Sequence, residues 1–248
     1  MPPPLSPLEM SVLASDGLIL KGILEYPDFA VGSRYPLAVL AHQYPATSDS
    51  YGPLVEDLLE RGMAVLAFDQ RGHGASIQSP DGLVVIDTPV GFTLEAFGAA
   101  FMSSAGRVGF QRIDDDILRV AAWGTSQNYV DPNRLLLVGS SVGGSGVLLA
   151  APKVPGLKAV VTFGAAGALA FGEDAPARIR RVVEGLSARC YFASSESDAF
   201  AGAENVRNWS KGLAHVTARI VPGDAHAMAI FYDVRDDVVD FIGRALGL

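Results

Sequence analysis

The stretch that decides the fold runs from Leu135 to Ala151 and reads LLLVGSSVGGSGVLLAA. Its leading apolar residues are typical of a strand buried on both faces, and the small and apolar residues that close it are compatible with a helix. Between them lies the pattern G-x-S-x-G, with Ser141 at its centre and Gly139 and Gly143 on either side. Glycine suits both flanks because a Cβ there would crowd the neighbouring backbone. Strand, tight turn and helix in this order predict a nucleophile elbow that presents the Ser141 hydroxyl, although a Gly-rich flexible turn is the alternative.

A base and an acid are required if Ser141 is to act, because a serine hydroxyl is a poor nucleophile until its proton is accepted. Of the four histidines, His226 alone lies late in the chain and beyond the last expected strand, and neutral imidazole accepts protons near pH 7. A surface loop histidine is the alternative interpretation. Asp198 and Glu196 compete to orient its ring, and Asp198 is favoured because it lies two residues further into the loop.

Short apolar segments alternate with segments of helical period along the chain. The expected strands are, in order, Met10–Ala14, Leu18–Leu24, Leu37–Ala41, Ala64–Phe68, Leu135–Val138, Ala159–Phe163, Arg189–Ala193 and Ala218–Val221. The first two flank a Ser-Asp-Gly turn and predict an antiparallel hairpin. The others alternate with helices, and this alternation predicts a three-layer α/β/α sandwich with a mostly parallel sheet of roughly eight strands. Each candidate residue follows an expected strand, and ligands of such sheets bind at the carboxyl ends of the strands.

The expected helices lie around 54–59, 93–102, 113–121 and 234–245, where apolar residues keep a helical period. Ser48–Ser50 offer N-cap candidates for the first of these, and Gly62 marks its end. A turn is expected at Asp131-Pro132, before the strand that leads to Ser141. No internal repeat or linker divides the chain. We therefore expect an extended tail over 1–7 and a single domain over 8–248.

The composition sets limits on function. The chain has 248 residues, of which 49% are apolar and 19% charged, enough for a large folded core. Its net charge of −8 argues against nucleic acid or an anionic membrane as a partner, since both bind clustered Lys and Arg. No apolar run approaches the ~20 residues of a membrane span, and no signal-peptide pattern precedes Lys21. We expect a cytoplasmic location, and a packing role for the single cysteine, Cys190.

Four motifs in the correct order carry a resemblance to a known superfamily. Residues 40–45 (LAHQYP) resemble a His-Gly-x motif that follows a strand, and residues 68–76 (FDQRGHGAS) are similar to an Asp-x-Arg-Gly-His-Gly-x-Ser loop. The elbow and the segment Pro222-Gly223-x-x-His226 complete the set. Over nearly its whole length the chain resembles the α/β-hydrolase superfamily, whose chain order is nucleophile, acid, histidine. The resemblance implies an α/β-hydrolase fold with Ser141 as nucleophile, Asp198 as acid and His226 as base.

The resemblance also implies an oxyanion hole. Its two backbone N–H donors would be those of Val142, after the nucleophile, and of Tyr44 in the His-Gly-x motif. The usual glycine of that motif is replaced here by Gln43, so we expect this side chain to narrow the pocket or to contact the substrate. In the second motif, Arg71 and His73 are expected to tie loops together.

The position of inserted sequence points to a subgroup. Only residues 164–187 separate two expected strands where many relatives carry a helical cap, so the chain resembles compact esterases of the dienelactone-hydrolase and prolyl-oligopeptidase-related group. The extra sequence lies at 77–111 and is rich in phenylalanine. It is interpreted either as an ordinary helix packed on the body or as a small flap over the acyl pocket, with Phe92 and Phe97 as substrate-binding residues.

These features predict a serine-dependent carboxylic ester hydrolase that acts on small, short-chain acyl esters through an acyl-enzyme. A thioesterase or an acyl-peptide hydrolase would use the same triad, and a non-catalytic ligand-binding protein is a third alternative. No organic cofactor is implied, and no metal, because the histidines lack ligand spacing. The expected partner is a small ester. The sequence gives no indication of oligomeric state.

Overall fold

The computed structural model describes residues 5–28, 34–91, 93–200 and 202–248, and its ten strands form one mixed sheet. The strands are β1 (Leu8–Leu13), β2 (Ile19–Glu25), β3 (Tyr35–Ala41), β4 (Ala64–Asp69), β5 (Gln78–Ser79), β6 (Gly82–Leu83), β7 (Val130–Ser140), β8 (Leu157–Phe163), β9 (Arg189–Ser195) and β10 (Val216–Val221). Their order in the sheet is β10-β9-β8-β7-β3-β4-β2-β5-β6, with β1 paired to β2. From β4 to β10 all neighbours are parallel, whereas β1, β2 and β4 pair in antiparallel fashion. The predicted hairpin and mostly parallel sheet are confirmed, and two-residue strands β5 and β6 extend the eight expected ones.

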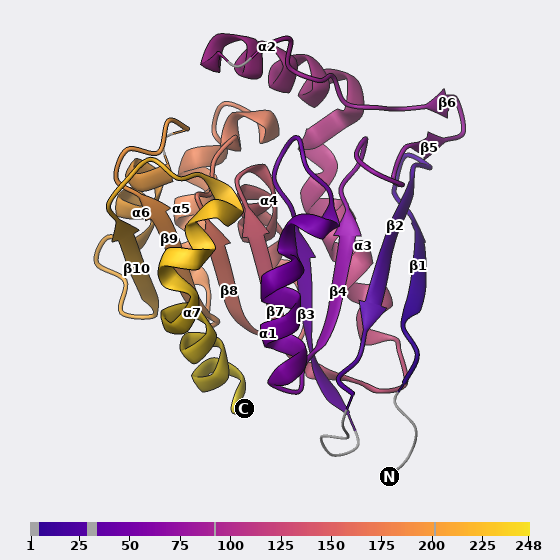
Figure 1. Cartoon of the computed structure of the whole chain (residues 1–248), viewed down its shortest axis with the longest axis vertical. Coiled ribbons are helices and arrows are strands. Elements are labelled where there is room, and N and C mark those ends of the chain that lie inside the picture. Colours follow the sequence, from indigo (N-terminus) through magenta and orange to yellow (C-terminus); the bar gives the residue numbers. More distant parts are fainter. Residues whose placement is uncertain (1–4, 29–33, 92, 201) are drawn as a thin grey trace.

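Helices cover both faces of the sheet, which makes three layers (Figure 1). One face packs against α1 (Gly52–Glu60) and α7 (Phe231–Leu246). The other face packs against α3 (Ile113–Thr125), α4 (Val142–Ala150), α5 (Ala175–Gly185) and α6 (Gly202–Ser210). Because both faces are covered, every residue of β3 is buried, as its continuous apolar sequence predicts.

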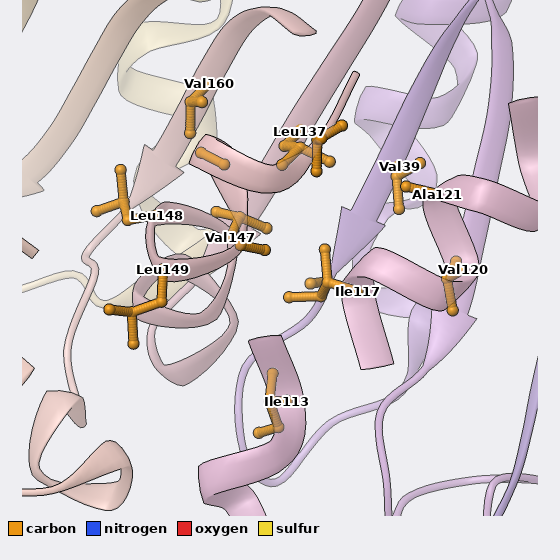
Figure 2. Close-up of a cluster of buried hydrophobic side chains, with 14 of the residues drawn as sticks. Val39, Ile113, Ile117, Val120, Ala121, Leu137, Val147, Leu148, Leu149 and Val160 are labelled. Carbon is orange, nitrogen blue, oxygen red and sulfur yellow. The ribbon is translucent and has the colours of Figure 1, made fainter. Parts of the chain in front are cut away.

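The core on the second face joins α3 and α4 to the central strands (Figure 2). The helical spacing of four and three residues that identifies α3 in the sequence places Ile113, Ile117 and Val120 on one fully buried face. Val147 and Leu148 of α4 lie in the same cluster. This packing holds the first turn of α4, and therefore the residue before it, in a fixed position relative to the sheet.

Two local predictions were wrong. The turn expected at Asp131-Pro132 lies inside β7, which begins at Val130. The register of β3 and β7 shifts between the Tyr35 and Leu37 pairings, and such an irregularity accommodates a proline without a backbone N–H.

The second error concerns the helix cap. No serine of the 48–50 segment caps α1, because this segment forms a 3-10 turn and Ser48 binds Asp69 through its backbone N–H and its hydroxyl. The expected stop at Gly62 is confirmed: α1 ends at Glu60, and Gly62 has a φ of +81°.

The segment 77–111 contains β5, β6, helix α2 (Leu94–Ser104) and a short π-helix, Ala105–Gly109. Thr93 caps α2 by accepting a hydrogen bond from the N–H of Ala96. In Figure 1, α2 lies across the carboxyl end of the sheet. Between β8 and β9 the structure has a 3-10 turn and α5 and no larger cap. No described helix is long and apolar enough to cross a membrane.

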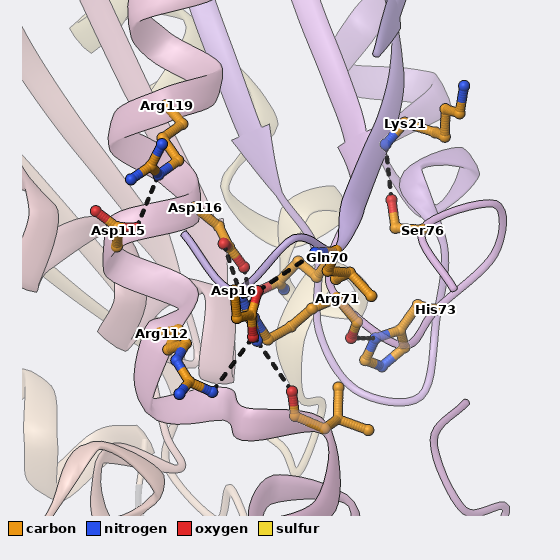
Figure 3. Close-up of polar contacts among 12 residues, drawn as sticks. Asp16, Lys21, Gln70, Arg71, His73, Ser76, Arg112, Asp115, Asp116 and Arg119 are labelled. Carbon is orange, nitrogen blue, oxygen red and sulfur yellow. Dashed lines mark hydrogen bonds and ion pairs between the residues drawn. The ribbon is translucent and has the colours of Figure 1, made fainter. Parts of the chain in front are cut away.

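A buried ion-pair cluster fixes the loop after β4 (Figure 3). The guanidinium of Arg71, which is almost fully buried, donates to both carboxylate oxygens of Asp116 in α3, at 2.6 and 2.9 Å. It also donates to Asp16 in the β1–β2 turn, at 2.9 Å, and to the carbonyl of Val108, at 3.0 Å. Burial lowers the pKa of Arg71, but the contacts with Asp116 and Asp16 outweigh this effect and raise the pKa. One charged side chain thereby joins three segments that are distant in sequence.

Candidate active site

Ser141 occupies a strained turn between β7 and α4. Its φ of +50° lies in a region that L-residues other than glycine rarely adopt. The two flanking glycines have little free space: a Cβ on Gly139 would lie 2.4 Å from the carbonyl oxygen of Gly143, and one on Gly143 would lie 2.1 Å from that of Ala41. The turn is therefore built as the G-x-S-x-G pattern predicts, with Ser141 half-buried and its hydroxyl at the edge of the sheet.

Three of the predicted site residues, from three separate loops, form one hydrogen-bonded chain. The hydroxyl of Ser141 lies 2.9 Å from Nε2 of His226. On the other side of the ring, Nδ1 lies 2.9 Å from each carboxylate oxygen of Asp198. With Nδ1–H donating to the carboxylate, Nε2 presents its lone pair to the Ser141 proton, which is the arrangement that general-base activation of a serine requires.

The geometry distinguishes the two candidate acids. The side chain of Asp198 is completely buried, whereas Glu196 is exposed and turned to solvent. Two further donors hold the carboxylate: the backbone N–H of Phe200 at 2.9 Å and the hydroxyl of Ser194 at 3.3 Å. A Cβ on Gly202 would lie 2.3 Å from the same carboxylate, so only glycine lets α6 begin this close to it. The carboxylate is thus desolvated but paired, and it holds the imidazole in one orientation.

The residues expected to form an oxyanion hole lie on both sides of the Ser141 hydroxyl. Val142 is the first residue of α4, so its N–H has no acceptor within the helix. Gly143 packs directly against the carbonyl groups of Ala41 and His42, which brings the following residues, Gln43 and Tyr44, beside the start of this helix. Within the described residues, neither Tyr44 nor Val142 donates its N–H to a backbone carbonyl.

Gln43 is anchored from below. The hydroxyl of Ser140 donates to its Oε1 at 2.6 Å, and the hydroxyl of Tyr51 lies 3.1 Å from Ser140 Oγ and 2.9 Å from the carbonyl oxygen of Ala41. Ser140 is fully buried in this arrangement. Because Oε1 is turned towards Ser140, the amide nitrogen of Gln43 is the polar atom left for other partners.

Two buried histidines, His42 and His73, contact the loop that carries Gln43 and Tyr44. His42 donates through Nδ1 to the carbonyl of Gln43 and accepts through Nε2 from the N–H of Gln70, so it has no room for a second proton. Burial, followed by the nearby ring of His73, lowers the pKa of His42 to about 3. Burial also lowers the pKa of His73, which stacks on Phe110. His73 therefore joins two loops through its contact with His42, as the sequence predicts for Arg71 and His73.

Aromatic rings connect α2 to the hydrogen-bonded chain. Phe97 and Phe101 pack edge-on against Tyr44, with ring centroids 5.3 and 5.4 Å away. Phe97 also contacts Phe200, whose ring lies 4.5 Å from that of His226. Phe200 is not among the residues predicted from the sequence, although its aromatic side chain lies only two positions after the candidate acid. Phe97 is placed beside the site, and Phe92 lies outside the described residues.

A cavity of about 350 Å³ opens beside these rings and is lined by Pro45, Thr88, Pro89, Gly91, Thr93, Leu94, Phe97 and Phe200. Across the described part of the chain, no group of three or more His, Cys, Asp or Glu side chains has the geometry of a metal site.

Comparison with known proteins agrees with the resemblance to α/β-hydrolases seen in the sequence. A family model described as "Serine aminopeptidase, S33" matches residues 35–208, a range that includes Ser141 and Asp198 and ends before His226. A search of curated proteins found no match.

Solved structures share the fold at low sequence identity. Est1E from Butyrivibrio proteoclasticus with bound ferulic acid has a TM-score of 0.72 at 19% identity, covering 96% of this chain and 100% of its own. Dienelactone hydrolase from Anabaena variabilis has a TM-score of 0.63 at 17% sequence identity, and the match covers 98% of this chain and 100% of that one. An esterase domain from a Rhodothermus marinus protein has a TM-score of 0.64 at 18% sequence identity, and the match covers 97% of this chain and 100% of that one.

The family model covers well over half of the chain, and the three-layer sheet, the strained elbow and the order of the site residues agree with it. The chain therefore belongs to the serine aminopeptidase S33 family of the α/β-hydrolase superfamily.

Proposed function

We propose that this protein is a serine-dependent carboxylic ester hydrolase that acts on small esters through an acyl-enzyme. The observation that carries the proposal is the unbroken chain from the Ser141 hydroxyl through His226 to the buried carboxylate of Asp198, with 2.9 Å at each link. A serine held in this way loses its proton to the imidazole as it attacks a carbonyl carbon, and the carboxylate stabilises the imidazolium that forms.

The proposed reaction has two halves. Ser141 Oγ attacks the ester carbonyl, and the N–H groups of Tyr44 and Val142 stabilise the oxyanion. His226 then passes the proton to the leaving alcohol oxygen, which completes the acyl-enzyme. Water, deprotonated by His226, attacks that intermediate. His226 then returns the proton to Ser141 Oγ as the acyl C–O bond breaks, which releases the acid and free Ser141. Removal of one oxyanion donor typically costs about 3–4 kcal/mol of transition-state stabilisation.

We further propose that the acyl group is short. Phe101 and Val142 both lie next to Gly167, where an added Cβ would approach Phe101 Cζ at 2.9 Å and Val142 Cβ at 3.4 Å. This packed contact beside the residue after the nucleophile leaves little room for a long chain. The amide nitrogen of Gln43, which has no hydrogen-bond acceptor among the described residues, adds a polar group on the same loop as Tyr44 and favours a small or polar acyl group.

An aminopeptidase, suggested by the description of the family model, is the second candidate. Such an enzyme must hold a cationic amine, for which a carboxylate is the usual partner. None of the described residues that line the cavity beside Phe200 carries a charge, and this favours the ester.

The test is a substrate panel with one protein preparation: p-nitrophenyl acetate, butyrate, octanoate and palmitate, a thioester, and a peptide anilide. We expect the largest kcat/KM at acetate or butyrate. A maximum at octanoate or beyond would reject the short acyl group, and faster turnover of the anilide or thioester would replace the ester as substrate class. Absence of any turnover would favour a non-catalytic ligand-binding protein.

A further inference from the structure

The cavity beside Phe200 has no part in the hydrogen-bonded chain, yet one of its walls is in contact with the base. Phe200 lines the cavity and at the same time packs against the His226 ring at 4.5 Å. Phe97 lines it from above and contacts both Phe200 and Tyr44. The cavity is therefore one side chain, Phe200, away from the imidazole, and Pro45, the residue after Tyr44, forms part of its wall.

The position of the cavity assigns it to one half of the ester. In the reaction proposed above, His226 donates its proton to the oxygen of the leaving alcohol, so the group attached to that oxygen must extend on the side of the imidazole. In this reaction the acyl group extends instead towards Val142, beside the close packing of Gly167 and Phe101. We infer that the cavity binds the leaving alcohol and selects an uncharged aromatic or bulky apolar one. This inference rests on the proposed function.

The chemistry of the walls supports a neutral occupant. The lining consists of prolines, phenylalanines, a leucine, a glycine and two threonines. A charged group would lose its hydration there without gaining a partner, because a cation needs a carboxylate and an anion needs Lys or Arg. Apolar cavities of about 150 Å³ hold a benzene molecule, so about 350 Å³ accommodates one ring with its linker.

Two isomeric esters test the orientation. Benzyl acetate carries the ring on the alcohol, and methyl phenylacetate carries it on the acyl group, with the same atoms in total. We expect kcat/KM for benzyl acetate to exceed that for methyl phenylacetate, and also that for ethyl acetate, by at least about tenfold, the selectivity of an apolar pocket. Preference for methyl phenylacetate would place the acyl group in the cavity and overturn the inference.

A second pair of esters tests the charge. Acetylcholine and 3,3-dimethylbutyl acetate have nearly the same shape and differ by one positive charge. The neutral ester is expected to have the larger kcat/KM, again by about tenfold. Equal values, or a preference for acetylcholine, would contradict an uncharged cavity.

Matched variants of α2 locate the effect. Leu94 lines the cavity and Met102 does not, and the two side chains are similarly exposed, at 60% and 55%, so neither change disturbs the core. Leu94→Glu should reduce the ratio of benzyl acetate to ethyl acetate turnover at least about fivefold and raise the relative rate with acetylcholine. Met102→Glu should leave both ratios unchanged. Equal effects of the two variants would reject the cavity as the binding site.

Failure of this inference and failure of the proposed function give different results. If the wild-type protein cleaves p-nitrophenyl acetate but shows no preference in either ester pair, only the alcohol site is refuted. If no ester is cleaved and a fluorophosphonate does not label Ser141, the proposed function is refuted and the alcohol site with it.

Discussion

At the scale of single residues, two adjacent serines have opposite surroundings. Ser140 is fully buried and donates to the side chain of Gln43. Ser141 is half-buried, and its hydroxyl faces His226. The difference follows from the strained backbone at Ser141, which turns its side chain out of the sheet just where the strand ends.

The first prediction compares these two serines. Ser141→Ala should lower kcat by about six orders of magnitude, to near background, because the nucleophile and the base act as a unit. Ser140→Ala should retain most of the activity, since the Ser140 hydroxyl bonds to Gln43 and Tyr51 and not to His226. Mass spectrometry after fluorophosphonate treatment should find the label on Ser141 in the wild type and in Ser140→Ala. A label on Ser140 would overturn the assignment.

The second prediction concerns the acid. Asp198→Asn should lower kcat about 10⁴-fold, because an amide no longer selects the imidazole tautomer that accepts the Ser141 proton. Glu196→Gln is the matched control, two residues away and exposed to solvent, and should keep activity within about twofold. Steady-state kinetics with p-nitrophenyl acetate measures both variants. A greater loss in Glu196→Gln would transfer the role to Glu196.

The sequence suffices to predict that Ser141, Asp198 and His226 lie together, because the elbow, the late histidine and the acid loop are separate local patterns in a fixed order. It does not suffice for Phe200, whose importance depends on where its ring packs in three dimensions. The sequence likewise shows that Gln43 replaces the usual glycine of the motif. It does not show that the buried hydroxyl of Ser140 fixes the orientation of the Gln43 side chain.

At the scale of elements, the loop after β4 is held by the Arg71 cluster. Arg71 joins the β1–β2 turn, α3 and the π-helix segment through Asp16, Asp116 and the Val108 carbonyl. The loop also carries Gln70 and His73, which contact His42, the residue before Gln43 and Tyr44. Loss of the cluster would therefore loosen a support of the site as well as the fold.

The third prediction compares neighbouring carboxylates of α3, both drawn in Figure 3. Asp116→Asn should destabilise the fold by about 3–5 kcal/mol, because it leaves the buried Arg71 charge with one partner fewer. Asp115→Asn weakens exposed contacts with Arg119 and Ser15, and should cost less than about 1 kcal/mol. Urea unfolding followed by circular dichroism measures both. Equal costs would show that burial of the pair does not determine its contribution.

Among the elements, prediction from the sequence was best where burial leaves a periodic pattern, as in α3 and the central strands. It was weaker at the boundaries: β7 extends through Pro132, and β5 and β6 are too short to leave a pattern. Helix α2 was predicted, since Thr93 and the phenylalanines are local features. Its contact with Tyr44 depends on tertiary packing, which the sequence does not contain.

At the scale of the whole molecule, the buried histidines couple folding to pH. Burial lowers the pKa of His42 to about 3 and also lowers that of His73, whereas an unfolded chain binds protons at histidine from about pH 6.5 downwards. Below pH 6.5 the unfolded state therefore binds more protons than the folded state. Stability is fully present above about pH 6.5 and is lost as the pH falls, by up to about 1.4 kcal/mol per pH unit for each histidine.

The fourth prediction follows from this linkage. The free energy of unfolding, measured in urea at pH 7.5, 6.5, 5.5 and 4.5, should fall below pH 6.5. His42→Gln keeps one donor and one acceptor but does not titrate. The slope of the unfolding free energy against pH, between pH 6.5 and 4.5, should therefore decrease by up to about 1.4 kcal/mol per pH unit. An unchanged slope in this variant would show that His42 does not cause the effect.

The two halves of the site differ in how far they lie from the edge of the sheet. Ser141 follows β7, which is paired on both sides by β3 and β8. His226 follows β10, the terminal strand of the described sheet, which pairs only with β9 and is largely exposed in its middle. Edge segments with few buried contacts open at lower free energy than central ones.

Hydrogen exchange should therefore be faster in β10 than in β7, and esterase activity should fade at urea concentrations below those that melt the sheet. Native-state exchange and activity, measured along one urea series, test this fifth prediction, and coincident loss of activity and sheet would contradict it. Activity would then be lost through local opening of one edge strand, β10, while β7 and Ser141 remain folded in the centre of the sheet.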